Sequence, residues 1–238
     1  RNAVIEGLSQ VKSTDEALSC LGYFLFVCKR RIEELVKMES LVGPPILGHI
    51  GCASLRSFLC NLARRGRDGE GLGVSVALLL SLTLREENGY IVNLYQSNTS
   101  RRKGGYQADL EVYCGSELFA ALELKDKPFS ASEVLSSADQ AWSNGFSRFL
   151  FVYGYGAGSV NYETFSQADY KAQESRGVFG SCVGFEQMVD AFLLILEDIN
   201  LEKVRSLTVG ILSDARVKAR TQTVTRELLR ELLADARK

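Results

Sequence analysis

Two strand-like segments joined by a short turn, within residues 109–125, constrain the fold of this chain more than any other feature. The first segment reads DLEVY and the second reads LFAALELK, with CGSE between them. Side chains point to opposite faces in turn along a strand. A three-residue loop of residues 115–117 would therefore pair Cys114 with Leu118 and set Asp109 opposite Glu123. The sequence predicts an antiparallel hairpin with this register.

The length of the loop decides which residues share a face of the hairpin. A two-residue loop would put Asp109 and Glu123 on opposite faces and mix polar with apolar residues on each. The three-residue loop instead makes one face wholly apolar, comprising Leu110, Val112, Ala120, Leu122 and Leu124. The other face then carries the charged groups, in the set Asp109, Glu111, Tyr113, Phe119, Ala121, Glu123 and Lys125.

Three ionisable groups, Asp109, Glu123 and Lys125, would meet near the open end of this hairpin. Carboxylate oxygens are the ligands that Mg²⁺ prefers in proteins. A divalent metal beside an ammonium group suits the activation of water against a phosphodiester. The alternative is an ordinary amphipathic hairpin with a solvated charged face, because any half-buried strand alternates in this way.

The composition is that of a globular protein without a general attraction to nucleic acids. The chain has 238 residues, of which 46% are hydrophobic and 24% are charged. This length is enough for one large domain or two small ones with a sizeable core. Because the net charge is only −1, any basic surface that binds nucleic acid must be local.

Cysteine and histidine usage argues against several kinds of site. The six cysteines include no CxxC pair, and His49 is the single histidine, which disfavours a zinc site and an HNH-type nuclease. The cysteines lie mostly in apolar segments, as expected for reduced thiols in a reducing cytoplasm. We see no signal peptide and no apolar run long enough to cross a bilayer. We therefore expect a cytoplasmic protein without a membrane partner.

Residues 1–40 are predicted to be helical, with a helix start near Thr14. Apolar residues here recur at alternating steps of three and four, as is typical of one helix face. We expect this stripe to pack into a core, with a partner or dimer surface as the alternative. A polar, glycine-rich stretch at residues 64–71 predicts a boundary between an N-terminal helical region, 1–66, and a core, 67–238. The stripe comprises Leu18, Leu21, Leu25, Cys28, Ile32 and Leu35.

The remaining segments predict a mixture of helices and strands. The expected helices are residues 53–63, 74–86, 132–143, 185–197 and 224–236. The expected strands, besides the hairpin, are residues 90–96, 148–153 and 206–212. This order indicates an α/β fold of mixed α+β character, with a central mixed β-sheet flanked by helices.

An aspartate that opens one strand and a Glu-x-Lys that ends the next resemble the PD-(D/E)xK nuclease superfamily. Here these residues are Asp109 and Glu123-Leu124-Lys125, although Ala108 stands where a proline often precedes the aspartate. The continuation is similar to SacI-type restriction endonucleases over roughly residues 70–155. It comprises residues 124–130, Glu133-Val134, residues 138–141 and Gly145.

The resemblance implies a restriction-endonuclease-like core and a Mg²⁺-dependent nuclease, with Mn²⁺ able to substitute. Asp109, Glu123 and Lys125 would be the catalytic residues, and the Leu124 carbonyl would join both carboxylates as metal ligands. Lys125 would orient the attacking water and stabilise charge on the phosphate. The expected products are a 5′-phosphate and a 3′-hydroxyl. The expected partners are double-stranded DNA and, by analogy, a second copy of the chain in a homodimer.

Other acidic and polar residues could extend the site. Glu70, at a predicted helix start, could be an additional acidic residue, or could simply suit the helix dipole. Glu86 and Glu87 are alternatives to it. Gln140 could face the site or could be a surface amide.

DNA-binding residues are harder to place than the catalytic ones. The basic loop Arg101-Arg102-Lys103 precedes Asp109 and could contact DNA phosphates, or could be a solvated loop. Residues 153–158 follow a strand but lack the Lys-Ser/Thr ending of a phosphate-binding loop, so we expect no nucleotide cofactor. Further basic residues are Arg64, Arg65, Arg67, Arg216, Lys218, Arg220, Arg226 and Arg230.

Three hypotheses follow for the activity. The first is a type II restriction enzyme, a site-specific deoxyribonuclease. The second is a repair or recombination nuclease of the same fold that cuts according to DNA structure. The third is a non-catalytic DNA-binding defence module in which the charged hairpin is incidental.

Overall fold

A computed structural model of the chain describes residues 13–42, 48–66, 69–84, 86–95, 108–158, 179–196, 199–214 and 217–235. The chain forms two compact units, Arg1–Pro44 and Pro45–Lys238.

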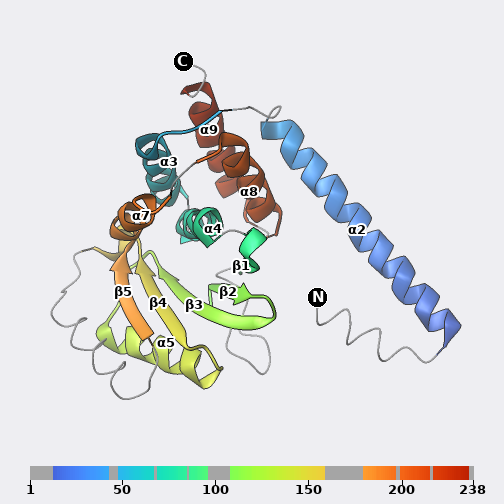
Figure 1. Ribbon diagram of the computed structural model, residues 1–238, viewed down its shortest axis with the longest axis horizontal. Helices are drawn as coiled ribbons and strands as arrows, with labels where there is room; N and C mark the ends of the chain where they lie inside the picture. The colour runs from blue at the N-terminus through green and yellow to red at the C-terminus, as the bar shows by residue number, and fades with distance from the viewer. Residues whose placement is uncertain are drawn as a thin grey trace. The chain divides into compact units, whose positions relative to one another are not determined.

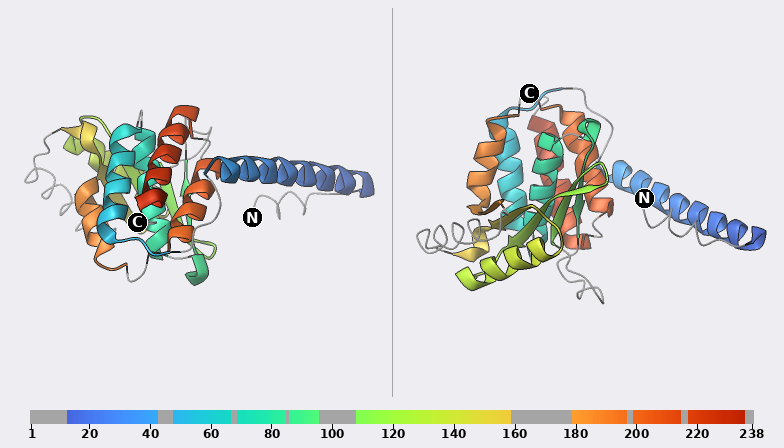
Figure 2. Two further views of the ribbon diagram at one scale, coloured as in Figure 1. Left: turned by 90° about the horizontal axis from the view of Figure 1, so that it is seen from above. Right: turned by 60° about the horizontal axis from the view of Figure 1, so that its bottom comes forward.

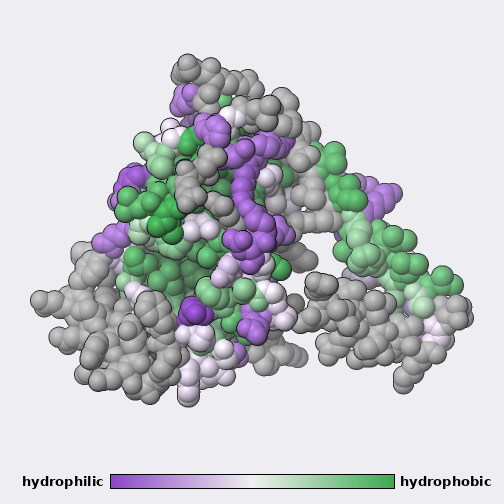
Figure 3. Space-filling view, viewed as in Figure 1, coloured by the Kyte–Doolittle hydropathy of each residue, from purple (hydrophilic) through white to green (hydrophobic). Residues whose placement is uncertain are grey.

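The described part of the first unit is one long helix, α2 (Thr14–Val42). It begins at the predicted residue, and the Ser13 hydroxyl accepts a hydrogen bond from the Glu16 backbone N–H at 3.2 Å. Four residues of the apolar stripe, Leu18, Leu21, Leu25 and Ile32, are exposed; Leu18, for example, has 61% of its surface accessible. Figure 3 shows this apolar surface along α2. The expectation that the stripe packs into a core is therefore not met within its unit, and the dimer-surface alternative stays a hypothesis.

The second unit is built on a five-stranded mixed sheet in the order β1-β2-β3-β4-β5, which Figure 1 shows below the main group of helices. The first three strands pair antiparallel and the last three pair parallel. The predicted mixed sheet is thus confirmed. The strands are β1 (Tyr90–Leu94), β2 (Leu110–Cys114), β3 (Glu117–Lys125), β4 (Arg148–Tyr153) and β5 (Phe179–Gly184).

Helices cover both faces of this sheet (Figures 1 and 2). One face packs against α5 through a buried apolar cluster that includes Ala121, Phe149 and Phe151. The other face packs against α4, whose residues 71–80 are all buried. The helices are α3 (Cys52–Arg65), α4 (Glu70–Leu84), α5 (Ala131–Ser143), α7 (Phe185–Leu193), α8 (Leu201–Asp214) and α9 (Ala219–Asp235), with short 3-10 turns η2 (Glu86–Asn88) and η3 (Tyr155–Ala157).

The burial of α4 explains its sequence. This helix lies between the sheet and the neighbouring helices α3 and α8. A helix that is covered on every side needs apolar residues all round rather than a single stripe. Gly73 brings α4 close to the sheet, because a Cβ atom there would lie 3.1 Å from a Leu94 methyl carbon of β1.

The turn between β2 and β3 is shorter than the sequence predicted. Cys114 pairs with Glu117, so the loop has the two residues Gly115 and Ser116 rather than three. Gly115 has a φ of 62°, a left-handed conformation that glycine adopts without strain and that tight hairpin turns require. The prediction of a three-residue loop is wrong because this glycine permits the tighter turn.

A β-bulge in β3 nevertheless restores the predicted pairing towards the open end of the hairpin. The register shifts by one residue, with Phe119 as the extra residue of β3. Leu110 then pairs with Leu122, so the next residue outward, Asp109, comes opposite Glu123. The bulge thereby combines a two-residue loop with the register that a three-residue loop would have given.

Two elements differ from the sequence prediction. Residues 206–212 were expected to form a strand but belong to α8, because Leu201, Val204 and Leu212 recur at helical spacing and are buried. The Asn200 side chain caps this helix by accepting hydrogen bonds from the backbone N–H groups of residues 202 and 203. Strand β5 was not predicted at all. The other predicted helices and strands are present, with ends shifted by a few residues.

The unit boundary also differs from the predicted one at residues 66/67. Helix α3 lies in the second unit, where it packs against α4, α7 and α9. Gly66, at the end of α3, and Gly71, in the first turn of α4, lie against each other, and a Cβ atom on Gly66 would clash with the Cα of Gly71. These two glycines therefore allow a close approach of the backbone inside one unit, at a place where the sequence resembles a linker.

Candidate active site

Asp109 lies directly before β2, beside the end of β3. Its Oδ2 atom accepts a hydrogen bond from the Leu124 backbone N–H at 2.9 Å. Burial raises the pKa of the Asp109 carboxyl, while this hydrogen bond and the charge of Lys125 act in the opposite direction. The carboxyl is therefore held in a partly desolvated position, where a nearby cation would favour its ionised form.

The backbone N–H and C=O groups of Leu124 face the side of β3 on which Asp109 lies. The carbonyl oxygen of Lys125 accepts a hydrogen bond from the Gly154 N–H at 2.8 Å, so the backbone N–H and C=O groups of Lys125 point towards β4. Successive residues of a strand point these groups to opposite edges. The N–H and the C=O of Leu124 therefore both point towards β2 and Asp109.

Lys125 ends β3 on the sheet face that α5 covers. Its Nζ atom lies 3.3 Å from Oε1 of Glu133, in the first turn of α5, and its side chain is 20% exposed. The positive charge of Lys125 also acts on the Asp109 carboxyl. The ammonium group therefore interacts with carboxylates from both the hairpin and the helix.

Glu123 is half-buried and lies two residues before Lys125 on the same face of β3. It pairs with Phe151 of β4 on one side, and the register of β2 brings Asp109 to its other side. The hairpin thus brings the predicted residues Asp109, Glu123, Leu124 and Lys125 to one end of the sheet.

The chemical type of the possible ligands at this end of the sheet suits a hard cation. Two carboxylates and a main-chain carbonyl are oxygen ligands, and Mg²⁺ commonly uses one or two carboxylates with water in its remaining positions. Within the described ranges no group of three or more His, Cys, Asp or Glu side chains could hold a metal ion. A site here would therefore depend on water and substrate oxygens as additional ligands.

A buried carboxylate lies beside the site, at a position that no sequence motif marks. Glu111 of β2 is only 7% exposed, and its Oε2 accepts hydrogen bonds from Tyr95 at 3.0 Å and Tyr113 at 2.7 Å. Burial, followed by the hydrogen bond to Glu111, raises the pKa of Tyr113. The backbone N–H of Tyr95 also donates to the carbonyl of Asp109 at 2.9 Å. This cluster therefore connects the end of β1 to the segment that holds Asp109. In the sequence, only the alternation of faces along β2 points to Glu111.

The other acidic candidates have contacts elsewhere in the unit. Oε2 of Glu70 accepts hydrogen bonds from the Thr221 hydroxyl at 2.9 Å and the Lys218 backbone N–H at 3.3 Å. These contacts place its carboxylate at the start of α9 and give it a structural role there. Glu86 is exposed, and Glu87 forms an ion pair with Lys203 at 3.5 Å. Any part of these residues in metal binding stays a prediction.

The polar and basic candidates for DNA contact are distributed as follows. Gln140 is exposed on α5. Arg65 of α3 pairs with Glu227 of α9 at 3.1 Å, and Lys218 lies 3.9 Å from Glu70. Arg101, Arg102, Lys103, Arg67 and Arg216 lie outside the described residues.

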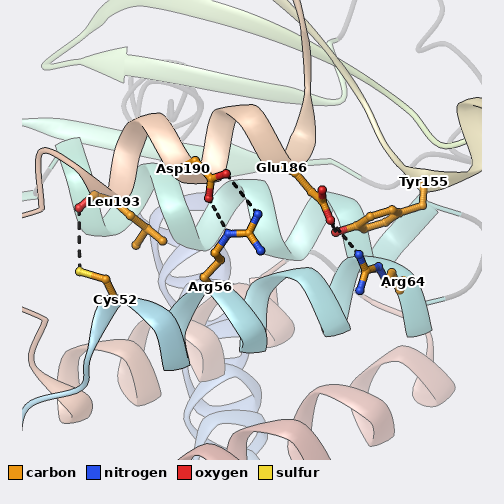
Figure 4. Close-up of polar contacts among 7 residues, drawn as sticks. All are labelled: Cys52, Arg56, Arg64, Tyr155, Glu186, Asp190 and Leu193. Atoms are coloured by element: carbon orange, nitrogen blue, oxygen red, sulfur yellow. Dashed lines mark hydrogen bonds and ion pairs between the residues drawn. The ribbon is translucent and has the colours of Figure 1, made fainter. Parts of the chain in front are cut away.

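Arg64 belongs to a network that ties α3 to α7 (Figure 4). It pairs with Glu186 at 2.7 Å, and the same Glu186 oxygen accepts a hydrogen bond from the Tyr155 hydroxyl at 2.8 Å. The Arg64 guanidinium also lies 4.3 Å from the centre of the Tyr155 ring. Because Tyr155 follows β4, the network fixes the connection that leaves this strand. Arg56 and Asp190 form a second pair between the same helices.

One comparison with known proteins gives a match. Residues 49–155 match the family model described as the SacI restriction endonuclease C-terminal domain. A comparison with curated proteins gives no match. The matched region covers just under half of the chain, runs from before α3 to after β4, and contains Asp109, Glu123, Leu124 and Lys125. It supports a relationship of this region to restriction endonucleases.

No helix among the residues that the structure describes is both long enough and apolar enough to cross a membrane.

Proposed function

We propose that this protein is a Mg²⁺-dependent endonuclease that hydrolyses double-stranded DNA at specific sequences, as a type II restriction enzyme does. One observation carries the proposal. The Asp109 carboxylate accepts a hydrogen bond from Leu124, the residue between Glu123 and Lys125. This contact holds the Asp109 carboxylate beside the Glu-x-Lys segment, as two neighbouring metal ligands would require. The family match over the same region supports this assignment.

Each residue has a defined role in the proposed reaction. Asp109 and Glu123 hold the cation, and the Leu124 carbonyl faces the same side and can complete the protein ligands. A bound Mg²⁺ supplies a water of lowered pKa and neutralises charge on the phosphoryl oxygens. Lys125 brings a positive charge to the scissile phosphate and stabilises the charge that develops on it.

The proposed partners are duplex DNA and a second copy of the chain. Two copies would place one site at each strand of the duplex, which is why we propose a homodimer rather than a monomer. The basic residues 101–103 precede Asp109 by a few positions, and we propose them as contacts to DNA phosphates. Mn²⁺ is expected to replace Mg²⁺, since it prefers the same oxygen ligands.

A plasmid cleavage assay tests this proposal. Supercoiled DNA is incubated with the wild-type protein in Mg²⁺, in Mn²⁺ and in chelator. Discrete fragments that require the metal support a sequence-specific enzyme, and smearing or cutting confined to branched DNA supports a structure-specific nuclease instead. The absence of cutting contradicts the proposal and leaves a DNA-binding module.

Variants at two glutamates of β3 make the assay specific to the site. Glu123→Gln should abolish cleavage, because it removes a proposed metal ligand with little change in size. Glu117→Gln is the matched control, since Glu117 is exposed at the start of the same strand. Equal loss of cleavage in both variants would argue against a special role for Glu123.

A further inference from the structure

We infer that Glu133 is a positioning residue that holds the Lys125 ammonium group at the site. This inference rests on the proposed function, because it concerns the residue that would act on the phosphate. Glu133 lies on a different element from the other proposed site residues, eight positions after Lys125. The inference depends on how the start of α5 is built.

Helix α5 begins with a capping box that fixes the Glu133 side chain. Its Oε2 atom accepts a hydrogen bond from the Ser130 backbone N–H at 2.9 Å. In return, the Glu133 backbone N–H donates to the Ser130 hydroxyl at 3.3 Å. These bonds hold one carboxylate oxygen, Oε2, against the end of the helix. They thereby also fix the direction of the other oxygen, Oε1.

That second oxygen is the one that contacts Lys125. The Nζ of Lys125 lies 3.3 Å from Oε1 of Glu133, although the Glu133 side chain itself is 46% exposed. An exposed ion pair between two free side chains contributes little, because both lose conformational freedom when they meet. Here the capping box has already restricted the Glu133 side chain, so only Lys125 loses conformational freedom when the pair forms. The geometry is that of an acceptor, held in place by the helix cap, that meets the Lys125 ammonium group.

The charges around Lys125 support this role. On one side its charge acts on the Asp109 carboxyl, and on the other it meets Glu133. An ammonium group has three donor hydrogens, so contact with Glu133 leaves donors for a phosphate oxygen. The carboxylate of Glu133 therefore limits the positions of Lys125 without using its full hydrogen-bonding capacity.

Two variants separate the ion pair from the helix cap. Glu133→Gln removes the charge that meets Lys125, but glutamine at this position also completes a capping box. Ser130→Ala does the reverse. It removes the capping hydroxyl and the bond which that hydroxyl donates to Oε2 of Glu133 at 3.2 Å, but the shorter bond to the same oxygen from the backbone N–H of residue 130, at 2.9 Å, remains and still holds Glu133. A role of Glu133 in folding alone predicts that both variants act on stability. Positioning predicts that they act on different quantities.

The first measurement is DNA cleavage in a single turnover at saturating DNA. We expect Glu133→Gln to lower the rate about tenfold, as modest misplacement of a catalytic group does, with unchanged DNA affinity in Ca²⁺ and an unchanged Tm. We expect Ser130→Ala to lower the Tm and leave the rate unchanged. An unchanged rate in Glu133→Gln would overturn the inference. A faster rate would also overturn it, because Glu133 would then restrain Lys125 away from the substrate.

The second measurement does not depend on nuclease activity. Lysines of the folded protein are acylated briefly, and the extent at Lys125 is read by mass spectrometry. We expect Lys125 to react several-fold more in Glu133→Gln than in the wild type, and equally in Ser130→Ala. Equal reactivity in all three proteins would overturn the inference. If the wild type cuts no DNA, the proposed function fails, and this measurement alone still decides whether Glu133 holds Lys125.

Discussion

The Glu111 cluster allows a quantitative prediction about the support of the site. The hydroxyl of Tyr113 donates to the nearly buried Glu111 carboxylate at 2.7 Å, and that of Tyr95 donates to the same oxygen at 3.0 Å. Hydrogen bonds to charged groups contribute about 1.5–3 kcal/mol each. Tyr113→Phe should therefore lower the free energy of unfolding by about 2 kcal/mol, which is roughly 4–8 °C in Tm for a chain of this length.

Combining two substitutions tests whether the cluster acts as a unit. Tyr95→Phe alone should cost about 1.5 kcal/mol, at the lower end of the same range because its bond is longer. The double variant should lose more than the sum, by about 0.5–3 kcal/mol, because neither phenol then donates to the Glu111 carboxylate.

Urea unfolding followed by circular dichroism measures all three variants. Tyr23→Phe is the control, since Tyr23 is 71% exposed on α2 and should change stability by less than about 0.5 kcal/mol. Strict additivity of the two cluster substitutions, or single costs as small as that of the control, would refute the reasoning.

Three further predictions concern the site, the core and a helix end. Asp109→Asn should abolish cleavage yet leave the Tm in chelator equal or higher. Burial raises the pKa of the Asp109 carboxyl, so the ionised carboxylate destabilises the folded protein above that pKa, whereas the amide oxygen of asparagine can still accept the Leu124 hydrogen bond. A clear fall in Tm would contradict this. Phe151→Ala should cost about 3–5 kcal/mol in urea unfolding, because the Phe151 side chain of β4 is fully buried in the cluster between the sheet and α5. A cost below about 1 kcal/mol would show that this cluster is not a packed core. Asn200→Ala should cost about 1 kcal/mol by loss of the α8 cap, measured in the same way, and an unchanged stability would show that the cap is dispensable.

Alternation of side chains predicted the site better than it predicted the loop. The requirement that polar residues share one face set Asp109 opposite Glu123, and this register is present. Without a bulge, the same requirement is met only by a loop with an odd number of residues. The bulge at Phe119 lies in a run of apolar residues that gives no sign of it in the sequence. Face parity is a property of the whole hairpin, whereas a bulge depends on local packing against neighbouring strands.

Other differences arise from contacts between distant residues. The run SLTVGIL in α8 contains β-branched residues and is typical of a strand, but tertiary packing of its buried face and the Asn200 cap favour a helix. The capping box of Ser130 and Glu133 is visible in the sequence. Its contact with Lys125 is not, because that contact requires β3 and α5 to be placed together.

The most direct test of the central claim is a crystal of the protein soaked in Mn²⁺, with anomalous scattering used to locate the metal. Our account predicts a peak coordinated by carboxylate oxygens of both Asp109 and Glu123 and by the Leu124 carbonyl, at the distances usual for such ligands. A peak bound elsewhere, or carboxylates too far apart to share one ion, would contradict it.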